Sequence, residues 1–166
     1  TELTHADTTG MTMILMGIIS ELKINHILTT EVSKHCSTVI KESDLARRII
    51  LAANQENTTP KHINSGLLTT HEEDPVKYNQ EEVKELYEQV NDSNYRIMNT
   101  DDGVHLFNKN SLQTAIDPFD FFKRIDVGDD TGHAFYLGVE LARAQIAYQL
   151  GKSYEQDEEL KWGCIV

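Results

Sequence analysis

Apolar residues near the start of the chain recur every three or four positions, which is the period of an α-helix. The stripe predicts one amphipathic helix, with Thr8 or Thr9 available to cap its N-terminus. Its members are Met11, Ile14, Leu15, Ile18, Ile19 and Leu22. We expect this stripe to be the buried face of the helix.

Extended segments flank the first helix. Ile24–Thr30 is short and β-branched, which favours a strand, and Glu2–Ala6 is a shorter extended piece. A second helix follows and must end before Pro60, because proline cannot continue a helix. Its apolar positions are Val39, Leu45, Ala46, Ile49, Ile50 and Ala53. The order strand, helix, strand, helix predicts a βαβα unit with parallel strands. Two strands make a poor sheet, so we expect the unit to belong to something larger.

The middle of the chain is polar and then acidic. Residues 56–79 lack periodicity and form a connector, and a short helix is predicted to begin at Gln80. Between His71 and Asp92 there are eight acidic side chains against Lys77 and Lys84. This charge is typical of a solvated face, and a docking surface for a basic partner is the alternative.

The period then changes to two, which predicts strands. Tyr95–Met98 and Val104–Phe107 flank a turn that contains an Asp-Gly pair, and Leu112–Ile116 could complete an antiparallel meander. Asp117 and Pro118 are expected to cap and open another helix. That helix would place Phe119, Phe122 and Ile125 on one face.

A long helix is predicted from Asp130 or Thr131 to a C-terminal glycine, Gly151. Two of its stripes are apolar, and only one stripe carries charge. The first apolar stripe is Phe135, Val139, Ala142, Ile146 and Leu150; the second is Leu137, Leu141, Ala144 and Tyr148. We expect this helix to be buried between the meander and a second covering element.

Composition narrows the classes of function. The 166 residues are 39% hydrophobic and carry a net charge of −12, which disfavours nucleic acid and anionic membranes as partners. The longest dense apolar run, Met11–Ile19, is too short to span a bilayer and lacks the flanks of a signal peptide, so a cytoplasmic protein is expected. Cys36 and Cys164 have no zinc-ligand spacing and are expected to be free thiols, and no metal site is expected.

Candidate chemistry begins at the loops that follow the two predicted strands, since such loops form the sites of parallel α/β proteins. Asp7 and Glu31 could accept hydrogen bonds from the N–H groups of a heterocycle. Thr29, Thr30 and Lys34 could hold its polar or anionic parts. The alternative is that these residues only cap a helix and form a turn.

A second candidate group lies in the long last helix. His133, Tyr136 and Glu140 share one face at helical spacing, and Arg143 continues it. Such a group could perform acid–base chemistry if a pocket exposed it. Local hydrogen bonding is the alternative use of the same side chains.

Two parts of the chain resemble known sequences. THADTTGMTMILMGIISEL, HILTTEVS and DLARRIILA resemble the final two βα units of the pterin-binding barrel in archaeal proteins related to dihydropteroate synthase. GHAFYLGVELARAQIAYQLGKSYEQDEELKWG resembles the C-terminal domain of unknown function that follows it. The resemblance implies that residues 1–70 end a TIM-type barrel and that residues 71–166 form an α+β domain. The expected fold class is thus α/β to α+β, with the meander packed on the last helix.

The resemblance also implies a ligand and partners. The parent protein would bind a reduced pterin in methanopterin or folate-type one-carbon metabolism, with Asp7, Thr29, Thr30, Glu31 and Lys34 near the barrel mouth. This chain would be its C-terminal fragment, inactive and without a cofactor alone, and would pair with the missing barrel or form a homodimer. Thr29, Thr30 and Glu31 stand where synthases carry a basic motif, which argues against the synthase reaction. A non-catalytic assembly or docking module is the alternative function.

Overall fold

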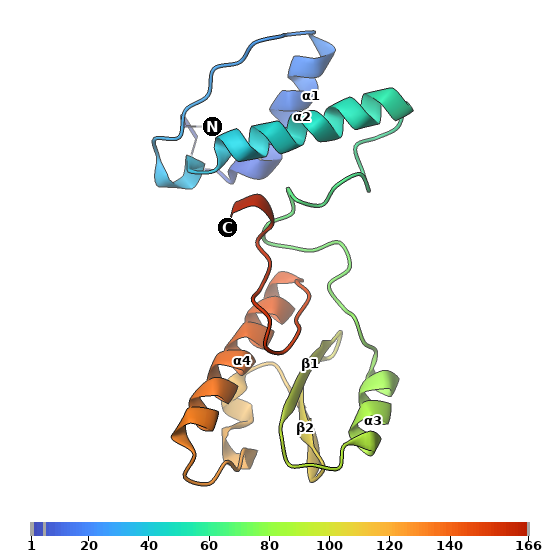
Figure 1. Cartoon of the computed structure of the whole chain (residues 1–166), viewed down its shortest axis with the longest axis vertical. Helices are drawn as coiled ribbons and strands as arrows, with labels where there is room; N and C mark the ends of the chain where they lie inside the picture. Colours follow the sequence, from blue (N-terminus) through green and yellow to red (C-terminus); the bar gives the residue numbers. More distant parts are fainter. Residues whose placement is uncertain (1, 5, 166) are drawn as a thin grey trace. The chain divides into compact units, whose positions relative to one another are not determined.

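The chain folds into two compact units (Figure 1). A computed structural model describes residues 2–4 and 6–165. The first unit comprises Thr1–Thr69 together with Trp162–Val166, and the second comprises Thr70–Lys161. Helices combine with one three-stranded antiparallel sheet, so the α+β class is confirmed.

Two packed helices make up most of the first unit: α1, Thr8–Glu21, and α2, Val39–Glu56. Short 3₁₀ turns, η1 (Lys34–Cys36) and η4 (Gly163–Ile165), complete the list of its regular elements in the described residues. Asp7, rather than Thr8 or Thr9, occupies the N-cap position of α1. The second helix stops at Glu56 because Asn57 adopts a left-handed conformation with φ of 52°, before Pro60 is reached.

The two predicted N-terminal strands are wrong for this chain. Residues 24–30 form no strand, and the described residues of 2–6 form turns and bends, whereas His5 lies outside the described residues. Figure 1 shows the segment between α1 and η1 as a long arc with no strand beside it. A strand is stabilised by hydrogen bonds to a partner, and the described part of this unit offers none. The βαβ crossover therefore does not form.

The first helix packs with the face opposite to the predicted one. The residues of α1 that are buried are Thr8, Thr9, Thr12 and Met16. By contrast, Ile14 is 66% exposed, and Leu15, Ile18 and Leu22 are exposed too. The threonines face α2 because Glu42 is fully buried there, and a buried carboxylate requires hydrogen-bond donors. Its two oxygens accept from the hydroxyls of Thr8 at 2.6 Å, Thr12 at 3.3 Å and Thr38 at 2.8 Å.

The second unit contains the predicted meander. Strands β1 (Arg96–Thr100), β2 (Gly103–Asn108) and β3 (Ser111–Ala115) pair in sequence order, each antiparallel to the next. Thr100 lies opposite Gly103, so the first turn is shorter than predicted and the strands are longer. Gly103 has a φ of 139°, a conformation that glycine adopts without strain.

A helix covers each face of this sheet (Figure 1). The first is α4, Thr131–Leu150, whose predicted ends are confirmed: the Asp130 side chain accepts from the His133 N–H, and Gly151 closes the helix at a φ of 62°. On the other face, α3 (Gln80–Gln89) packs Tyr87 edge-on against Phe107. The core between α4 and the sheet contains Tyr95, Ile97, Val104, Leu106, Phe121, Leu137, Leu141, Ala144, Ala147 and Tyr154.

The first apolar stripe of α4 is not covered as predicted. Phe135 is 76% exposed, and Ile146 is exposed as well. The predicted helix after Pro118 is replaced by two 3₁₀ turns, η2 (Pro118–Asp120) and η3 (Phe122–Arg124). These turns bury Phe121 in the core and leave Phe119 and Phe122 outside. The last helix is therefore buried on one side only within the described part of this unit.

Candidate functional site

The five pterin candidates of the first unit lie around the long arc and the helix ends beside it. Asp7 stands before α1, Thr29, Thr30 and Glu31 lie on the arc, and Lys34 opens η1. Among the described residues, no hydrogen bond or ion pair joins these five to one another. Glu31 instead accepts the backbone N–H of Ile40, in the first turn of α2, at 3.0 Å. The candidates are therefore on one unit but do not form a connected site in this chain.

Glu2 holds the end of the arc, and sequence analysis did not single it out. One of its oxygens accepts the N–H groups of Val32 at 2.7 Å and Ser33 at 2.9 Å. Hydrogen bonds from Ser33 and then Val32 lower the pKa of Glu2 to about 2. The His35 ring lies 2.9 Å from the carbonyl oxygen of Thr4 and adds a second link to the same segment.

An apolar groove of about 440 Å³ lies between α1, the start of the arc and α2. Its charged lining residue, Arg47, is already paired with Asp44. The lining comprises Met16, Ile19, Ser20, Ile24, Asn25, Ile27, Arg47, Ile50 and Leu51. The groove is a continuation of the uncovered apolar face of this unit.

In the second unit, three of the four candidate acid–base residues join one hydrogen-bond network. Glu140 is only 2% exposed, and it accepts from Arg143 Nη1 at 2.7 Å and from the Tyr154 hydroxyl at 2.8 Å. Tyr136 donates to Asp157 at 2.7 Å. His133 has its ring 6.1 Å from the Tyr136 ring, centre to centre, and its side chain forms no hydrogen bond to the network.

This network holds the C-terminal tail of the unit, residues 152–161, against α4. Burial raises the pKa of the Tyr154 hydroxyl, and Glu140 beside it raises it further. Burial also raises the pKa of Tyr136. Both phenols therefore stay protonated and donate to carboxylates, which is a holding role.

Gln156 of the same tail occupies the outer edge of β1. Its amide oxygen accepts the Ile97 N–H at 2.8 Å, and its amide nitrogen donates to the Tyr95 carbonyl at 3.3 Å. One side-chain amide thus supplies the pair of bonds that a neighbouring strand would supply. It also donates to the Tyr136 hydroxyl at 2.7 Å, which links the strand edge to the network.

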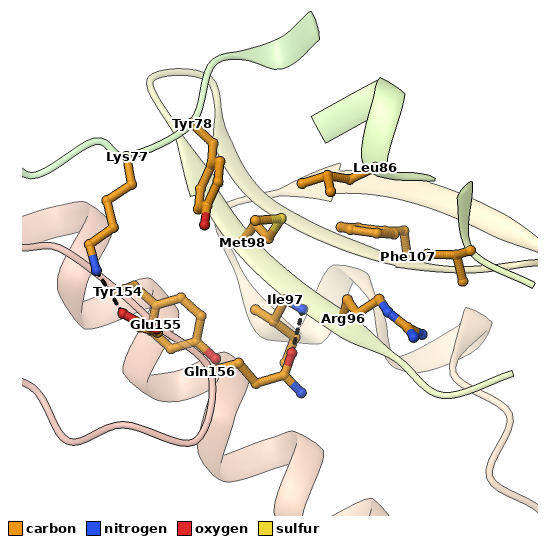
Figure 2. A pocket seen from close by; sticks show the side chains of 11 residues that line it. Lys77, Tyr78, Leu86, Arg96, Ile97, Met98, Phe107, Tyr154, Glu155 and Gln156 are labelled. Atoms are coloured by element: carbon orange, nitrogen blue, oxygen red, sulfur yellow. Dashed lines mark hydrogen bonds and ion pairs between the residues drawn. The ribbon is translucent and has the colours of Figure 1, made fainter. Parts of the chain in front are cut away.

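A cavity of about 340 Å³ opens beside this edge, between α3 and the tail; we call it the β1 groove. Figure 2 shows Leu86, Met98 and Phe107 together on one side and the Lys77–Glu155 pair with Gln156 on the other. The Tyr78 side chain extends toward Met98. The lining comprises Lys77, Tyr78, Leu86, Val90, Arg96, Ile97, Met98, Phe107, Tyr154, Glu155 and Gln156. The volume is in the range of small binding sites.

Ion pairs neutralise both cations of the groove. Lys77 Nζ lies 2.7 Å from Glu155, a contact that raises the pKa of Lys77 and lowers that of Glu155. Arg96 donates to both oxygens of Asp92 at 2.8 Å, and this hydrogen-bonded guanidinium lowers the pKa of Asp92 to about 2. Lys77 is protonated at neutral pH and is no nucleophile, and the lining includes no Ser, Thr, Cys or His. The groove is therefore suited to binding.

Sequence analysis did not find the β1 groove, because five separate segments of the chain build it. The tail was singled out only for its resemblance to a family, and the closing helix was singled out for other residues than those that line the groove. Across residues 2–4 and 6–165, no three His, Cys, Asp or Glu side chains are placed to hold a metal ion. Within those residues, too, no helix has the length and apolar character needed to cross a bilayer.

Comparison with known proteins gives one relative with no known function. The chain is 28% identical over 183 residues to uncharacterized protein MJ0107 of Methanocaldococcus jannaschii. The match covers 96% of this chain and 34% of the relative, so the chain spans about a third of that protein's length. No family model matches the chain. No solved structure matches it.

Proposed function

We propose that this chain is the C-terminal part of a dihydropteroate synthase-related protein that binds a reduced pterin. In this proposal, residues 1–70 supply the last βα units of the barrel, and residues 71–166 form the domain that follows. The observation that carries the proposal is the uncovered apolar face of the first unit. Ile14, Leu15, Ile18 and Leu22 of α1 are exposed, and Leu28 on the unpaired arc is 94% exposed.

Such a face favours a missing layer of structure. Burying one fully exposed large aliphatic side chain contributes about 1.5–3 kcal/mol. These four side chains on α1 are 42–66% exposed, so together they leave roughly 3–7 kcal/mol of burial unrealised in this chain. In a parallel barrel, outer helices pack their apolar stripe against the strands, and residues 24–30 would gain a partner on each side. The greater length of the archaeal relative is in keeping with additional structure of this kind.

The proposed pterin site is the mouth of the completed barrel. Asp7 and Glu31 follow the two segments that would become strands, where barrel enzymes place their ligands. Their carboxylates would accept the N–H donors of the pterin ring, and Thr29, Thr30 and Lys34 would hold its polar parts. The activity would be a pterin-dependent transfer in cytoplasmic one-carbon metabolism. This chain alone lacks the scaffold that would position those groups.

The test compares this chain with the protein encoded by its full reading frame. Calorimetry with a dihydropterin is expected to detect binding by the long protein and none by residues 1–166. Asp7→Asn and Glu31→Gln in the long protein are expected to weaken binding at least tenfold, or about 1.4 kcal/mol. Glu21→Gln, at the far end of α1, is the matched control and should bind normally.

Hydrogen exchange supplies an independent readout. Amides of residues 25–30 should exchange freely in this chain and be protected in the long protein, because strand pairing would occupy them. Equal exchange in the two proteins would disprove the barrel-end assignment even if a pterin bound elsewhere. Tight pterin binding by the isolated chain would disprove the assignment of the site.

A further inference from the structure

We propose that the β1 groove docks a basic segment of another protein, with a large apolar side chain of that segment on Met98 and Phe107. This proposal concerns the second unit and does not depend on the pterin proposal. The floor of the groove is apolar, and it includes Leu86, which is exposed at the surface of α3. Methionine is flexible and polarizable, so Met98 adapts to side chains of different shape.

The charge of the second unit selects the partner. This unit carries 20 acidic and nine basic side chains, whereas the first unit carries seven and six. Nearly all of the net charge of −12 therefore belongs to the unit with the groove. A field of this sign attracts a cationic segment and speeds its association.

The acidic side chains beside the groove are on its tail side. On α3, Glu81, Glu85 and Glu88 are exposed, but helical spacing places them on the outer face of the helix, opposite the buried Val83 and outside the lining. On the tail side, Glu155 lines the groove, and the exposed residues 157–159 are Asp, Glu and Glu. An apolar floor beside an acidic tail, in a unit of strong negative charge, is complementary to an apolar side chain flanked by Lys or Arg.

The pairing of the two lining cations argues against an anionic ligand. Lys77 already has Glu155 at 2.7 Å, and Arg96 already has both oxygens of Asp92. A carboxylate or phosphate would have to displace one of these partners and would also face the acidic tail. A cationic side chain meets the exposed carboxylates without breaking either pair.

The open edge of β1 adds a backbone feature to the site. This strand lies at the edge of the sheet, and in the described residues the Gln156 amide takes the place of a partner strand at Tyr95 and Ile97. An extended guest is therefore able to continue alongside the strand where Gln156 stops. The apolar anchor of the guest would lie beside this edge, over Met98.

The binding test uses the full chain and a fluorescent peptide of about ten residues, with Leu and Phe at its centre and two Lys or Arg on each side. Binding is expected by fluorescence polarisation. Replacing Leu and Phe by Ser should weaken binding at least tenfold, and replacing the basic residues by Glu should abolish it. Raising the ionic strength from about 0.05 to about 0.5 M should weaken binding several-fold, because salt screens exposed charges.

Substitutions at the groove test whether the peptide binds there. Leu86→Glu alters the lining at an exposed helical position, and the pair Glu158→Lys with Glu159→Lys reverses the charge of the tail beside the groove; each should weaken binding at least tenfold. The pair Asp120→Lys with Asp129→Lys makes the same charge change at exposed positions away from the lining and should cost less than threefold. Circular dichroism confirms that each variant is folded.

Three results would overturn the proposal. One is equal loss of binding in the groove variants and in the control pair, which would indicate unspecific attraction. Another is equally tight binding of the Glu peptide or of a small aromatic carboxylate. The third is self-association of the chain that Leu86→Glu abolishes, since a second copy would then be the occupant.

Discussion

The Glu140→Gln substitution tests whether the buried network holds the C-terminal tail in place. The carboxylate of Glu140 is surrounded by donors: the guanidinium of Arg143, the hydroxyl of Tyr154 and the backbone N–H of Asp157, at 3.2 Å. An amide has nearly the same shape but brings one acceptor and one donor in place of two acceptors. The change therefore removes hydrogen bonds with little change in packing volume.

The expected cost follows from the two orientations of the new amide. If its oxygen faces Arg143, its NH₂ group faces Tyr154, which can turn to accept, and the N–H of Asp157, which cannot. If it is reversed, the NH₂ group faces the guanidinium. Each orientation loses a hydrogen bond to a charged group and leaves a donor unpaired, which costs about 2–3 kcal/mol. That free energy corresponds to about a 30- to 150-fold change in an opening equilibrium.

Amide hydrogen exchange measures this opening directly. Amides of the tail and of Ile97, which donates to Gln156, should exchange about 30- to 150-fold faster in Glu140→Gln. Amides of α3 are expected to keep their rates, because that helix packs on the other face of the sheet. Glu158→Gln, with an exposed side chain in the same tail, is the matched control and should exchange as the parent does.

A double-mutant cycle tests the physical argument. Tyr154→Phe removes one donor to Glu140 and should cost about 1–2 kcal/mol alone. The double mutant should be destabilised by about 1 kcal/mol less than the sum of the two single costs, because both substitutions remove the same hydrogen bond. Strict additivity, or an exchange rate in Glu140→Gln within about twofold of the parent, would refute the network as the element that holds the tail.

Two further predictions concern the first unit. Gly163→Ala should lower its unfolding temperature: Gly163 has a φ of 61°, and an added Cβ would lie 2.6 Å from the Gly66 carbonyl oxygen, whereas Gly10→Ala has open space and should be neutral or stabilising. Glu2 has a folded pKa of about 2 against 4.5, so its link to Ser33 contributes stability above pH 4.5 that is lost as the pH falls to about 2. An NMR pH titration of the Glu2 carboxyl and of the Ser33 amide shift checks this. The prediction is contradicted if the Ser33 amide titrates with the same midpoint in Glu2→Gln as in the parent.

The second unit was largely predictable because its structure is local in the sequence. Each strand pairs with the next one along the chain, and the turns carry their own signals. The ends of α4 were likewise predictable, since Asp130 and Gly151 act on the residues beside them. The exposure of Phe119 and Phe122 was not predictable, because it follows from the burial of Phe121 in the core.

The first unit was predicted less well because its strands depend on partners. Residues 24–30 have the composition of a strand, but pairing is not a property of one segment. The orientation of α1 was also wrong, because one buried carboxylate, Glu42, accepts from the hydroxyls of Thr8 and Thr12 and so turns that face of α1 toward α2. Periodicity locates an apolar stripe, but it does not detect a polar contact from a residue about 30 positions away.

The candidate sites follow the same division. Helical spacing, a local property, grouped His133, Tyr136, Glu140 and Arg143, and in the structure Arg143 donates to Glu140. Their partners Tyr154 and Gln156 lie outside the helix, so their holding role was visible only in three dimensions. A side-chain amide that completes a strand edge has no sequence signature of its own.

The surfaces of the two units indicate different kinds of partner. The first unit is nearly neutral and exposes aliphatic side chains on α1 and on the unpaired arc, which suits permanent burial in a larger core. The second unit is strongly acidic and has a formed sheet, a fixed tail and a groove with paired charges, which suits reversible contact with a cationic partner. Salt separates the two cases: screening should weaken docking at the β1 groove, whereas it should leave apolar burial of α1 intact. The two units therefore need separate tests, because failure of either proposal leaves the physical basis of the other unchanged.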